Sequence, residues 1–274
     1  MTYPAFLLLF VVLPIGILSL WALVDVRRGR WIPQALRGWP VWLVLGGHSL
    51  VALLYTTPWD NYLVATGVWY YNPDLVTGIT FGWVPLEEYL FFILQPLMTG
   101  LLLLTFARYL PLNAEFSEGR RMRLLLLAPL VGVWLIAAFI LVRGWPPGTY
   151  LGLELIWALP PILLQLAFGG DLIWRYRRPI LVTIIVSTIF LAAADSLAIR
   201  AGTWTIDPDQ SLHVFIGSIL PVEELVFFLL TNVLVVFGVT LVAAEESHVR
   251  FRRLSQRLRA RAAGIEDDHA DQAA

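Results

Sequence analysis

The sequence carries one acidic signature twice, as Pro85-Leu86-Glu87-Glu88-Tyr89-Leu90-Phe91-Phe92 and as Pro221-Val222-Glu223-Glu224-Leu225-Val226-Phe227-Phe228. Each copy opens a long apolar segment, so two pairs of glutamates lie at the edge of a membrane or inside it. Carboxylates at such a depth cost several kcal/mol unless they are paired, protonated or facing a cavity. Because this unfavourable placement occurs twice, the carboxyl groups of these acidic motifs are expected to serve chemistry or transport.

The composition predicts an all-α membrane protein. Of the 274 residues, 58% are hydrophobic and 14% are charged, and the mean hydropathy is +0.74, which no soluble single domain matches. Apolar stretches of about 20 residues are the signature of transmembrane helices. Seven such stretches are read at 4–24, 40–57, 85–107, 124–142, 150–169, 179–199 and 214–244. No basic region precedes the first, so it is expected to be a transmembrane helix and not a cleaved signal peptide.

The basic residues predict the orientation. All 19 are arginines, and 17 of them fall in the segments that follow the first, third, fifth and seventh apolar stretches. The positive-inside rule then places the N-terminus outside the cell membrane (the inner membrane where there are two) and the C-terminus in the cytoplasm. Both acidic motifs enter the bilayer from the outer side. The charged segment 246–274 is expected to be a cytoplasmic tail that forms a solvated extension; the alternative is that its Arg-rich first half lies on anionic lipid headgroups.

Half of the chain is duplicated. Five positions, Asp60, Gly67, Trp69, Pro73 and Asp74, recur 135 residues later as Asp195, Gly202, Trp204, Pro208 and Asp209. The acidic motifs follow at an offset of 136, and Leu13-Pro14 with Asp25 matches Leu159-Pro160 with Asp171 at 146. Matches at nearly fixed spacing indicate an internal repeat.

The repeat predicts a three-plus-one-plus-three plan. Residues 1–110 form the first module, 111–148 contain the joining helix, and 149–245 form the second module. The joining helix gives both repeats the same direction in the membrane, so a pseudo-twofold axis along the membrane normal relates them. The two glutamate pairs then lie at one depth and face a shared central space.

Helix geometry separates the glutamates of each pair. Acidic residues near a helix N-terminus are also favoured by the helix dipole alone, which is the structural alternative. Neighbouring residues on a helix differ by about 100°, and the stripe of Glu88 continues through Gln95 and Thr99 and is the more polar one. Glu88 and Glu224 are therefore predicted to face the cavity, with Glu87 and Glu223 as partners or packing elements.

Carboxyl groups and aromatic rings in an apolar pocket suit the protonation of an alkene. Burial favours the protonated form of a carboxyl group, and two neighbouring carboxyls can divide the roles of acid and base. Phenylalanine and tryptophan faces stabilise a cation without attacking it. This combination predicts an isoprenoid cyclase or isomerase that acts on a lipid-soluble substrate.

The motifs resemble those of the membrane-integral, non-flavin lycopene cyclases. Thr57-Pro58-Trp59-Asp60-Asn61-Tyr62, Gly67-Val68-Trp69-Tyr70 and the segment from Val84 to Gln95 are similar to the first module of that family. Asp195-Ser196, Gly202-Thr203-Trp204, the second acidic motif and Thr231-Asn232 are similar to the second module. The likeness covers about residues 1–245 and corresponds to the fused, two-module form.

The resemblance implies closure of the ψ ends of lycopene into β-ionone rings, by way of γ-carotene, without net redox change. It implies an intramolecular lyase or isomerase in which Glu87, Glu88, Glu223 and Glu224 are catalytic. The chain has no Gly-x-Gly-x-x-Gly fingerprint, so no flavin or other cofactor is expected. Because both motifs lie at one depth, one composite pocket is expected to cyclise one end and then the other.

The candidate substrate-binding residues are Asp60, Asp195, Phe91, Phe92, Gln95, Phe227, Phe228, Thr231, Asn232, Trp69 and Trp204. Loop capping is the alternative role for the two aspartates, and an interfacial belt is the alternative for the tryptophans. No repeated His/Asp spacing supports a metal site. The expected partners are lycopene, γ-carotene, membrane lipid and other carotenoid enzymes, with no nucleic acid.

Two other functions stay open. One is a related membrane cyclase acting on a C50 carotenoid or another polyene. The other is a small-solute transporter, since parallel repeats also occur in carriers. The strong acids cluster towards one end of the helices and not at the midplane, which favours the enzyme. A retinal protein is excluded because no lysine is present to form a Schiff base.

Overall fold

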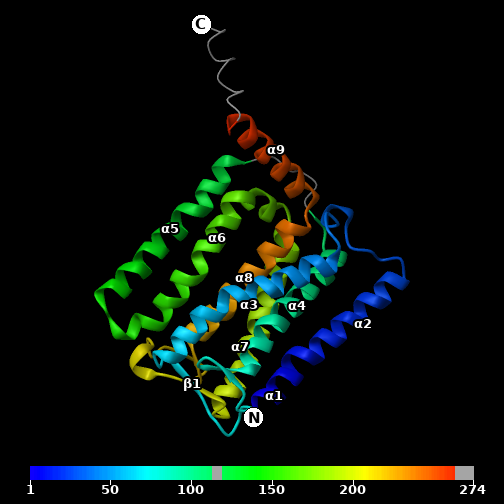
Figure 1. The fold of residues 1–274 in the computed structure, drawn as a ribbon. Helices are drawn as coiled ribbons and strands as arrows, with labels where there is room; N and C mark the ends of the chain where they lie inside the picture. Colours follow the sequence, from blue (N-terminus) through cyan, green and yellow to red (C-terminus); the bar gives the residue numbers. More distant parts are fainter. Residues whose placement is uncertain (113–118, 263–274) are drawn as a thin grey trace.

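The computed structural model describes residues 1–112 and 119–262, and this part of the chain is a bundle of long helices (Figure 1). Within it, seven helical segments are long and apolar enough to cross a membrane, so the predicted all-α, multi-pass membrane fold is confirmed. The first span consists of α1 (Tyr3–Leu7), the π-helical turn η1 (Leu8–Val12) and α2 (Leu13–Arg27). The others are α3 (Val41–Ala65), α4 (Leu86–Tyr109), α5 (Arg120–Arg143), α6 (Thr149–Arg175), α7 (Arg177–Arg200) and α8 (Val222–Ala243).

Two predicted boundaries were wrong. The second span was expected to end at 57, but α3 continues through Pro58 to Ala65. Hydropathy alone misses this last part because it is polar, yet the Asp60 side chain is buried and Asn61 donates to the carbonyl of Thr57. The seventh span was expected from 214, but α8 begins only at Val222, directly after Pro221.

The two central helices are α4 and α8. In the most apolar 18-residue stretch of each helix, 61% of α4 and 56% of α8 is buried, against 6% of α5. Helix α3 packs on α4, and both α6 and α7 pack on α8. Helix α5 packs mainly along α6 at one side of the bundle, and α2 lies at the other (Figure 1). The motif-bearing helices therefore form the core that the remaining spans surround.

Short strands close the end of the bundle that holds the acidic motifs, called here the acidic end. Strand β1 (Trp69–Tyr71) pairs antiparallel with β4 (Trp204–Ile206), and Tyr70 lies opposite Thr205. Two hairpins lead into α4 and α8: β2 (Thr80–Phe81) with β3 (Val84–Pro85), and β5 (Phe215–Ile216) with β6 (Leu220–Pro221).

The register of the β1–β4 pair bears on the predicted repeat. Tyr70 and Thr205 stand 135 positions apart, which is the offset of the sequence repeat in this region. A strand pair centred on equivalent residues is what a twofold relation between the modules requires. The register supports the three-plus-one-plus-three plan, which stays a prediction.

The opposite end of the bundle, called here the arginine-rich end, differs from expectation. The first part of the tail forms helix α9 (Glu245–Ala262), and its start is held against the bundle and not solvated. Ser247 and Arg250 are buried, and Arg175 forms an ion pair of 2.7 Å with Glu246. The expectation of a solvated tail is wrong for residues 246–250, because Glu246 and Arg250 form ion pairs with α6. Most side chains of residues 251–260 are exposed, as expected, and residues 263–274 lie outside the described chain.

Candidate active site

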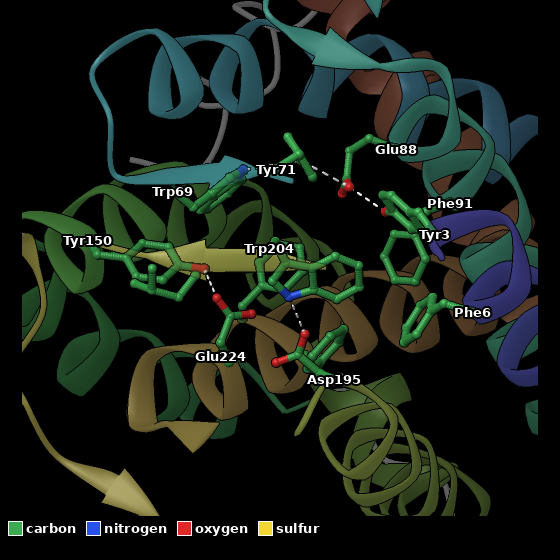
Figure 2. Close-up of a pocket in the computed structure, with 13 residues that line it drawn as sticks. Tyr3, Phe6, Trp69, Tyr71, Glu88, Phe91, Tyr150, Asp195, Trp204 and Glu224 are labelled. Atoms are coloured by element: carbon green, nitrogen blue, oxygen red, sulfur yellow. Dashed lines mark hydrogen bonds between the residues drawn. The ribbon is translucent and has the colours of Figure 1, made fainter. Parts of the chain in front are cut away.

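A cavity at the acidic end lies between the two motif-bearing helices and the β1–β4 strand pair (Figure 2). We call it the acidic cavity. It is lined by Tyr3, Phe6, Trp69, Tyr71, Glu88, Phe91, Tyr150, Asp195, Trp204, Ile206, Glu224, Phe227 and Phe228. Residues of both predicted modules therefore meet in one space, and three of them carry carboxyl groups.

Glu88 lies within a pair of tyrosines. The phenol of Tyr3, from the start of the first span, donates a short hydrogen bond to Glu88 Oε2. The phenol of Tyr71, from β1, donates to the same oxygen at 3.1 Å. Two donors on one oxygen suit a carboxyl group that carries negative charge during a reaction.

Glu224 has a different set of neighbours. Its Oε1 accepts one hydrogen bond, from the phenol of Tyr150 at 2.8 Å. The carboxyl groups of Glu88, Glu154, Glu223 and Asp195 interact with it electrostatically. Glu154 and Glu223 are fully buried. A cluster of neighbouring acids cannot all be ionised in an apolar interior, so protons are shared within it.

Glu87 and Glu223 do not line the acidic cavity. Glu87 Oε1 accepts the backbone N–H of Thr77 at 2.6 Å, and Glu223 Oε1 accepts that of Leu212 at 2.6 Å. Thr77 and Leu212 are again 135 positions apart. The first glutamate of each motif thus forms a hydrogen bond to the backbone of the preceding loop. Glu88 and Glu224 line the cavity, as the helical stripe predicts. A catalytic role for any of the four stays a prediction.

The repeated aspartates are not equivalent in the structure. Asp195 lines the acidic cavity and accepts a hydrogen bond of 2.9 Å from Trp204 Nε1. Asp60 is buried at 1% exposure, and neither of its carboxyl oxygens has a hydrogen-bond partner. Trp69 is the repeat counterpart of Trp204, but it does not bond to Asp60; it donates to the phenol of Tyr71 at 3.1 Å. The second module has Ile206 where the first has Tyr71, and this substitution accounts for the asymmetry.

Aromatic rings surround the carboxyl groups. The Trp204 ring lies 4.9 Å from that of Tyr3 and 5.2 Å from that of Phe6, centroid to centroid. Figure 2 shows Glu88 and its two tyrosines on one side of Trp204, and Glu224 with Asp195 on the other. Phe227 and Phe228 pack edge to face at 5.3 Å. The ring faces supply negative potential without a nucleophilic atom.

The remaining predicted residues lie deeper in the bundle. Phe92, Gln95 and Thr231 line an apolar groove next to the acidic cavity. Asn232 lines neither space. Its Oδ1 accepts from Gln95 and Thr99, both at 2.9 Å, and its Nδ2 donates to Thr188 at 3.2 Å. The position of Asn232 is that of a buried bridge between α4, α7 and α8, and its predicted role in substrate binding stays a prediction.

Six site residues were missed from the sequence: Tyr3, Phe6, Tyr71, Tyr150 and Ile206, which line the acidic cavity, and Glu154, which interacts with Glu224. A signal existed for two of them, because Tyr3 and Tyr150 begin the first helix of each predicted module. Their offset of 147 differs by one from the 146 of the following Leu-Pro pair, which hides the match. The π-helical turn Leu8–Val12 lies in that interval of the first module and accommodates one extra residue.

The Tyr71 phenol keeps its proton over a wide range of pH. Burial, followed by the neighbouring carboxyl groups of Asp60 and Glu88, raises the pKa of Tyr71 well above its ordinary value. Its hydrogen bond to Glu88 is therefore a stable part of the site. Among the described residues, no group of three or more His, Asp or Glu side chains is arranged to hold a metal ion.

The fold and the site define a multi-pass membrane protein with a cavity of carboxyl groups and aromatic rings. The family model described as lycopene cyclase matches residues 1–106 and 147–242. The chain therefore belongs to the lycopene cyclase family, and the resemblance seen in its motifs is confirmed.

Curated relatives carry matching names. A lycopene beta-cyclase of Halobacterium salinarum is 40% identical over 224 residues, which are 81% of this chain and 90% of the relative. A bifunctional lycopene cyclase/phytoene synthase of Podospora anserina is 35% identical over 204 residues, which are 72% of this chain and 34% of that protein. One of Leptosphaeria maculans is 38% identical, over 69% of this chain and 34% of its own length. No solved structure matches the chain.

Proposed function

We propose that the protein is a lycopene β-cyclase that closes the ψ ends of lycopene into β-ionone rings, giving γ-carotene and then β-carotene. The family and the halobacterial relative support the reaction. The observation that carries the proposal is the placement of Glu88 and Glu224, from the two modules, in one aromatic cavity. The reaction makes the enzyme an intramolecular lyase or isomerase.

The reaction needs one proton given and one proton removed. A general acid protonates C2 of the terminal double bond, which leaves a cation at C1. The C5–C6 double bond attacks C1, so that the C1–C6 bond forms and the cation moves to C5. Loss of the proton from C6 then gives the C5–C6 double bond of the β ring. No electron is transferred, and the carboxyl groups of the chain are sufficient for both proton steps.

The hydrogen bonds favour Glu224 as the acid and Glu88 as the base. Glu224 has a single phenol donor and lies among other carboxyl groups, which keeps a proton available on the cluster. Glu88 Oε2 accepts from both Tyr3 and Tyr71, which stabilises the carboxylate that removes a proton. The cation between them is stabilised by the faces of Trp204, Phe227 and Phe228.

Expression in lycopene-accumulating cells, followed by pigment chromatography, tests the function. The unaltered chain is expected to yield γ-carotene and β-carotene. Glu224→Gln is expected to leave lycopene unchanged, because no cation forms. Glu88→Gln is expected to lower turnover and to divert proton loss to C4 or to the C5 methyl group, giving ring isomers other than β.

The first glutamate of the motif offers a matched control. Glu87→Gln retains an oxygen that accepts the Thr77 N–H, so it is expected to keep the β ring as product. Unchanged lycopene in cells that hold the unaltered protein in their membrane would refute the function. Identical products from Glu88→Gln and the unaltered chain would refute the role of Glu88 as the base.

We also propose the setting of the enzyme. The positive-inside rule supports an acidic end that faces outwards and an arginine-rich end in the cytoplasm of the cell membrane. Lycopene and γ-carotene are the proposed substrates, membrane lipid is the surrounding medium, and other carotenoid enzymes are the proposed protein partners. A C50 carotenoid, cyclised by the same steps, is the second candidate substrate.

A further inference from the structure

An apolar groove continues the acidic cavity along the bundle. Phe91 and Phe227 line both spaces, so the groove adjoins the acidic cavity at these two rings. From there the groove runs between α3, α6 and α8, where it is lined on α3 from Thr56 back to Leu43. Its lining on α8 runs from Phe227 to Val242. The groove thus leads from the acidic end almost to the arginine-rich end.

The combined length fits a linear C40 polyene. From Glu224 at the acidic cavity to Val242 is 18 residues of α8, or about 27 Å at 1.5 Å per residue. A fully extended C40 polyene is about as long as the hydrocarbon core of a bilayer, roughly 30 Å. One end group in the acidic cavity therefore leaves a chain that the groove can hold over its whole length.

Resting on the proposed function, we propose that this groove is the binding site for the unreacted part of the polyene, with the reacting end in the acidic cavity. A second apolar groove, lined by Gly46, Leu50 and Leu97 among others, shares no described lining residue with the acidic cavity. Of these two grooves, the first is the one that adjoins the cavity holding the carboxyl groups. It places the far end of the substrate at the opposite end of the bundle.

The far end is a separate subsite. His48 and Gln165 line the groove and also a wider space beside it, which Trp39, His248 and Phe251 help to enclose. His248 and Phe251 belong to α9, so the tail helix forms a wall of this subsite. Because γ-carotene carries a finished ring when its second end reacts, this space receives either an open ψ end or a ring.

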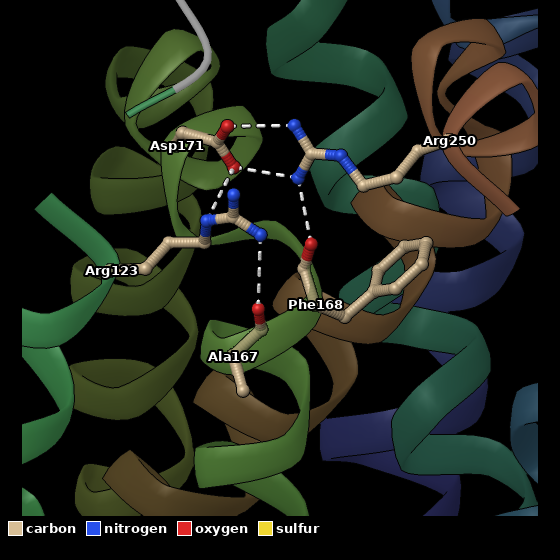
Figure 3. Close-up of polar contacts among 5 residues, drawn as sticks. All are labelled: Arg123, Ala167, Phe168, Asp171 and Arg250. Atoms are coloured by element: carbon tan, nitrogen blue, oxygen red, sulfur yellow. Dashed lines mark hydrogen bonds and ion pairs between the residues drawn. The ribbon is translucent and has the colours of Figure 1, made fainter. Parts of the chain in front are cut away.

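An ion-pair cluster holds α9 in this position. Arg250 binds Asp171 through two hydrogen bonds of 2.7 Å each, and also donates to the carbonyl of Phe168 at 2.7 Å (Figure 3). Arg123 approaches the same aspartate at 3.9 Å. Asp171 and Phe168 lie on α6, the helix that also supplies Gln165. The cluster thereby fixes the wall of the far-end subsite to the wall of the groove.

Two neighbouring glycines of α3 allow a matched test. Gly47 lines the groove and Gly46 does not, and a Cβ atom at either position meets nothing within 4 Å. Gly47→Phe blocks the groove 13 residues from Asp60, about 20 Å along the helix, and the Asp60 carboxyl group interacts with that of Glu88 in the acidic cavity. A C20 polyene with the same ψ end is about half as long as the bilayer core, roughly 15 Å, and ends before the block.

The experiment compares turnover of lycopene and of the C20 polyene by the full-length enzyme in lipid nanodiscs. Gly47→Phe is expected to lower kcat/KM for lycopene by about tenfold or more and to leave the C20 polyene within about twofold. Gly46→Phe is expected to convert both substrates like the unaltered enzyme. The proposed groove would be refuted if both variants converted lycopene equally well. It would also be refuted if Gly47→Phe lowered kcat/KM equally for lycopene and for the C20 polyene.

A binding measurement separates the groove from the chemistry. In the Glu224→Gln background, which leaves lycopene unreacted, lycopene bound in a chiral groove is expected to show induced circular dichroism in the visible range. The signal is expected to persist with Gly46→Phe and to be lost with Gly47→Phe. Its absence in Glu224→Gln itself would mean that the groove holds lipid chains only. A signal without turnover in the unaltered enzyme would refute the proposed function and leave the groove in place.

Discussion

Tyr3 and Tyr150, at the starts of two different membrane helices, make the same hydrogen bond. Tyr3 donates to Glu88 and Tyr150 donates to Glu224, so each motif glutamate in the acidic cavity is held by a tyrosine from the first helix of its own predicted module. Both phenyl rings are buried, at 2% and 1% exposure. The glutamates are therefore oriented from outside their own helices.

Removing either phenol is expected to slow the reaction. A hydrogen bond to a charged group contributes about 1.5–3 kcal/mol, so Tyr3→Phe and Tyr150→Phe should each lower kcat by roughly tenfold or more. KM should stay nearly constant, because the rings that contact the substrate are retained. Tyr62→Phe, on an exposed side chain of α3, is the control. A change confined to KM would show that the phenols only shape the pocket.

The Tyr71 phenol predicts a pH effect on stability. Its pKa is raised in the folded state, whereas an unfolded tyrosine loses its proton near about pH 10. Above that pH the folded state binds more protons than the unfolded state, so stability falls as the pH rises. Tyr71→Phe should make this fall in Tm less steep above about pH 10 and leave its slope unchanged below. Tyr70→Phe, at an exposed neighbour, should retain the full slope.

Asn232 is expected to act through stability. Asn232→Leu removes the acceptor of the Thr99 hydroxyl and one of the two acceptors of the Gln95 amide, and a buried donor left without an acceptor costs about 1–3 kcal/mol. Thermal unfolding in detergent should show a lower Tm, with KM for lycopene unchanged. Thr231→Val is the adjacent control for Tm alone, since its hydroxyl bonds only within its own helix. A raised KM at constant Tm would restore the substrate-binding role of Asn232.

The Asp171–Arg250 pair is expected to be worth far more than the neighbouring Arg175–Glu246 pair. The Asp171 and Arg250 side chains are 2% and 9% exposed, and breaking such a pair from one side costs about 3–5 kcal/mol. Arg175 and Glu246 are 20% and 22% exposed, and a pair of this kind contributes about 1 kcal/mol or less. Denaturant unfolding of Asp171→Asn and Glu246→Gln measures the contrast. Equal losses would mean that α9 is held by other contacts.

Much of the architecture was predictable because it repeats. Apolar length gave the seven spans, and the doubled motif with its 100° spacing placed Glu88 and Glu224 on the cavity side of their helices. Polar residues such as Asp60 made the predicted end of α3 too early. Hydropathy depends on the residue type alone and does not show that a polar side chain is buried in the protein.

Other parts of the site depend on long-range contacts that no local pattern contains. Tyr71 reaches Glu88 only because β1 pairs with β4 across 135 residues. Glu154 lies in an ordinary apolar helix and has no acidic counterpart in the first module, so the repeat could not reveal it. Asn232 was predicted from the sequence to bind substrate. Only the packing of α4 on α8 shows that its amide faces a neighbouring helix instead.

The π-helical turn Leu8–Val12 lets the two halves of one membrane span be positioned independently. At the acidic end, Tyr3 must reach Glu88; at the arginine-rich end, Asp25 must accept the hydrogen bond of Tyr109 at 2.7 Å. One additional residue in an unbroken α-helix would rotate one end against the other by about 100°. The wider π-helical turn takes up that rotation, so the residues before and after it keep their own orientations. One additional residue in the first module is thus accommodated without disturbing either the acidic end or the arginine-rich end of the span.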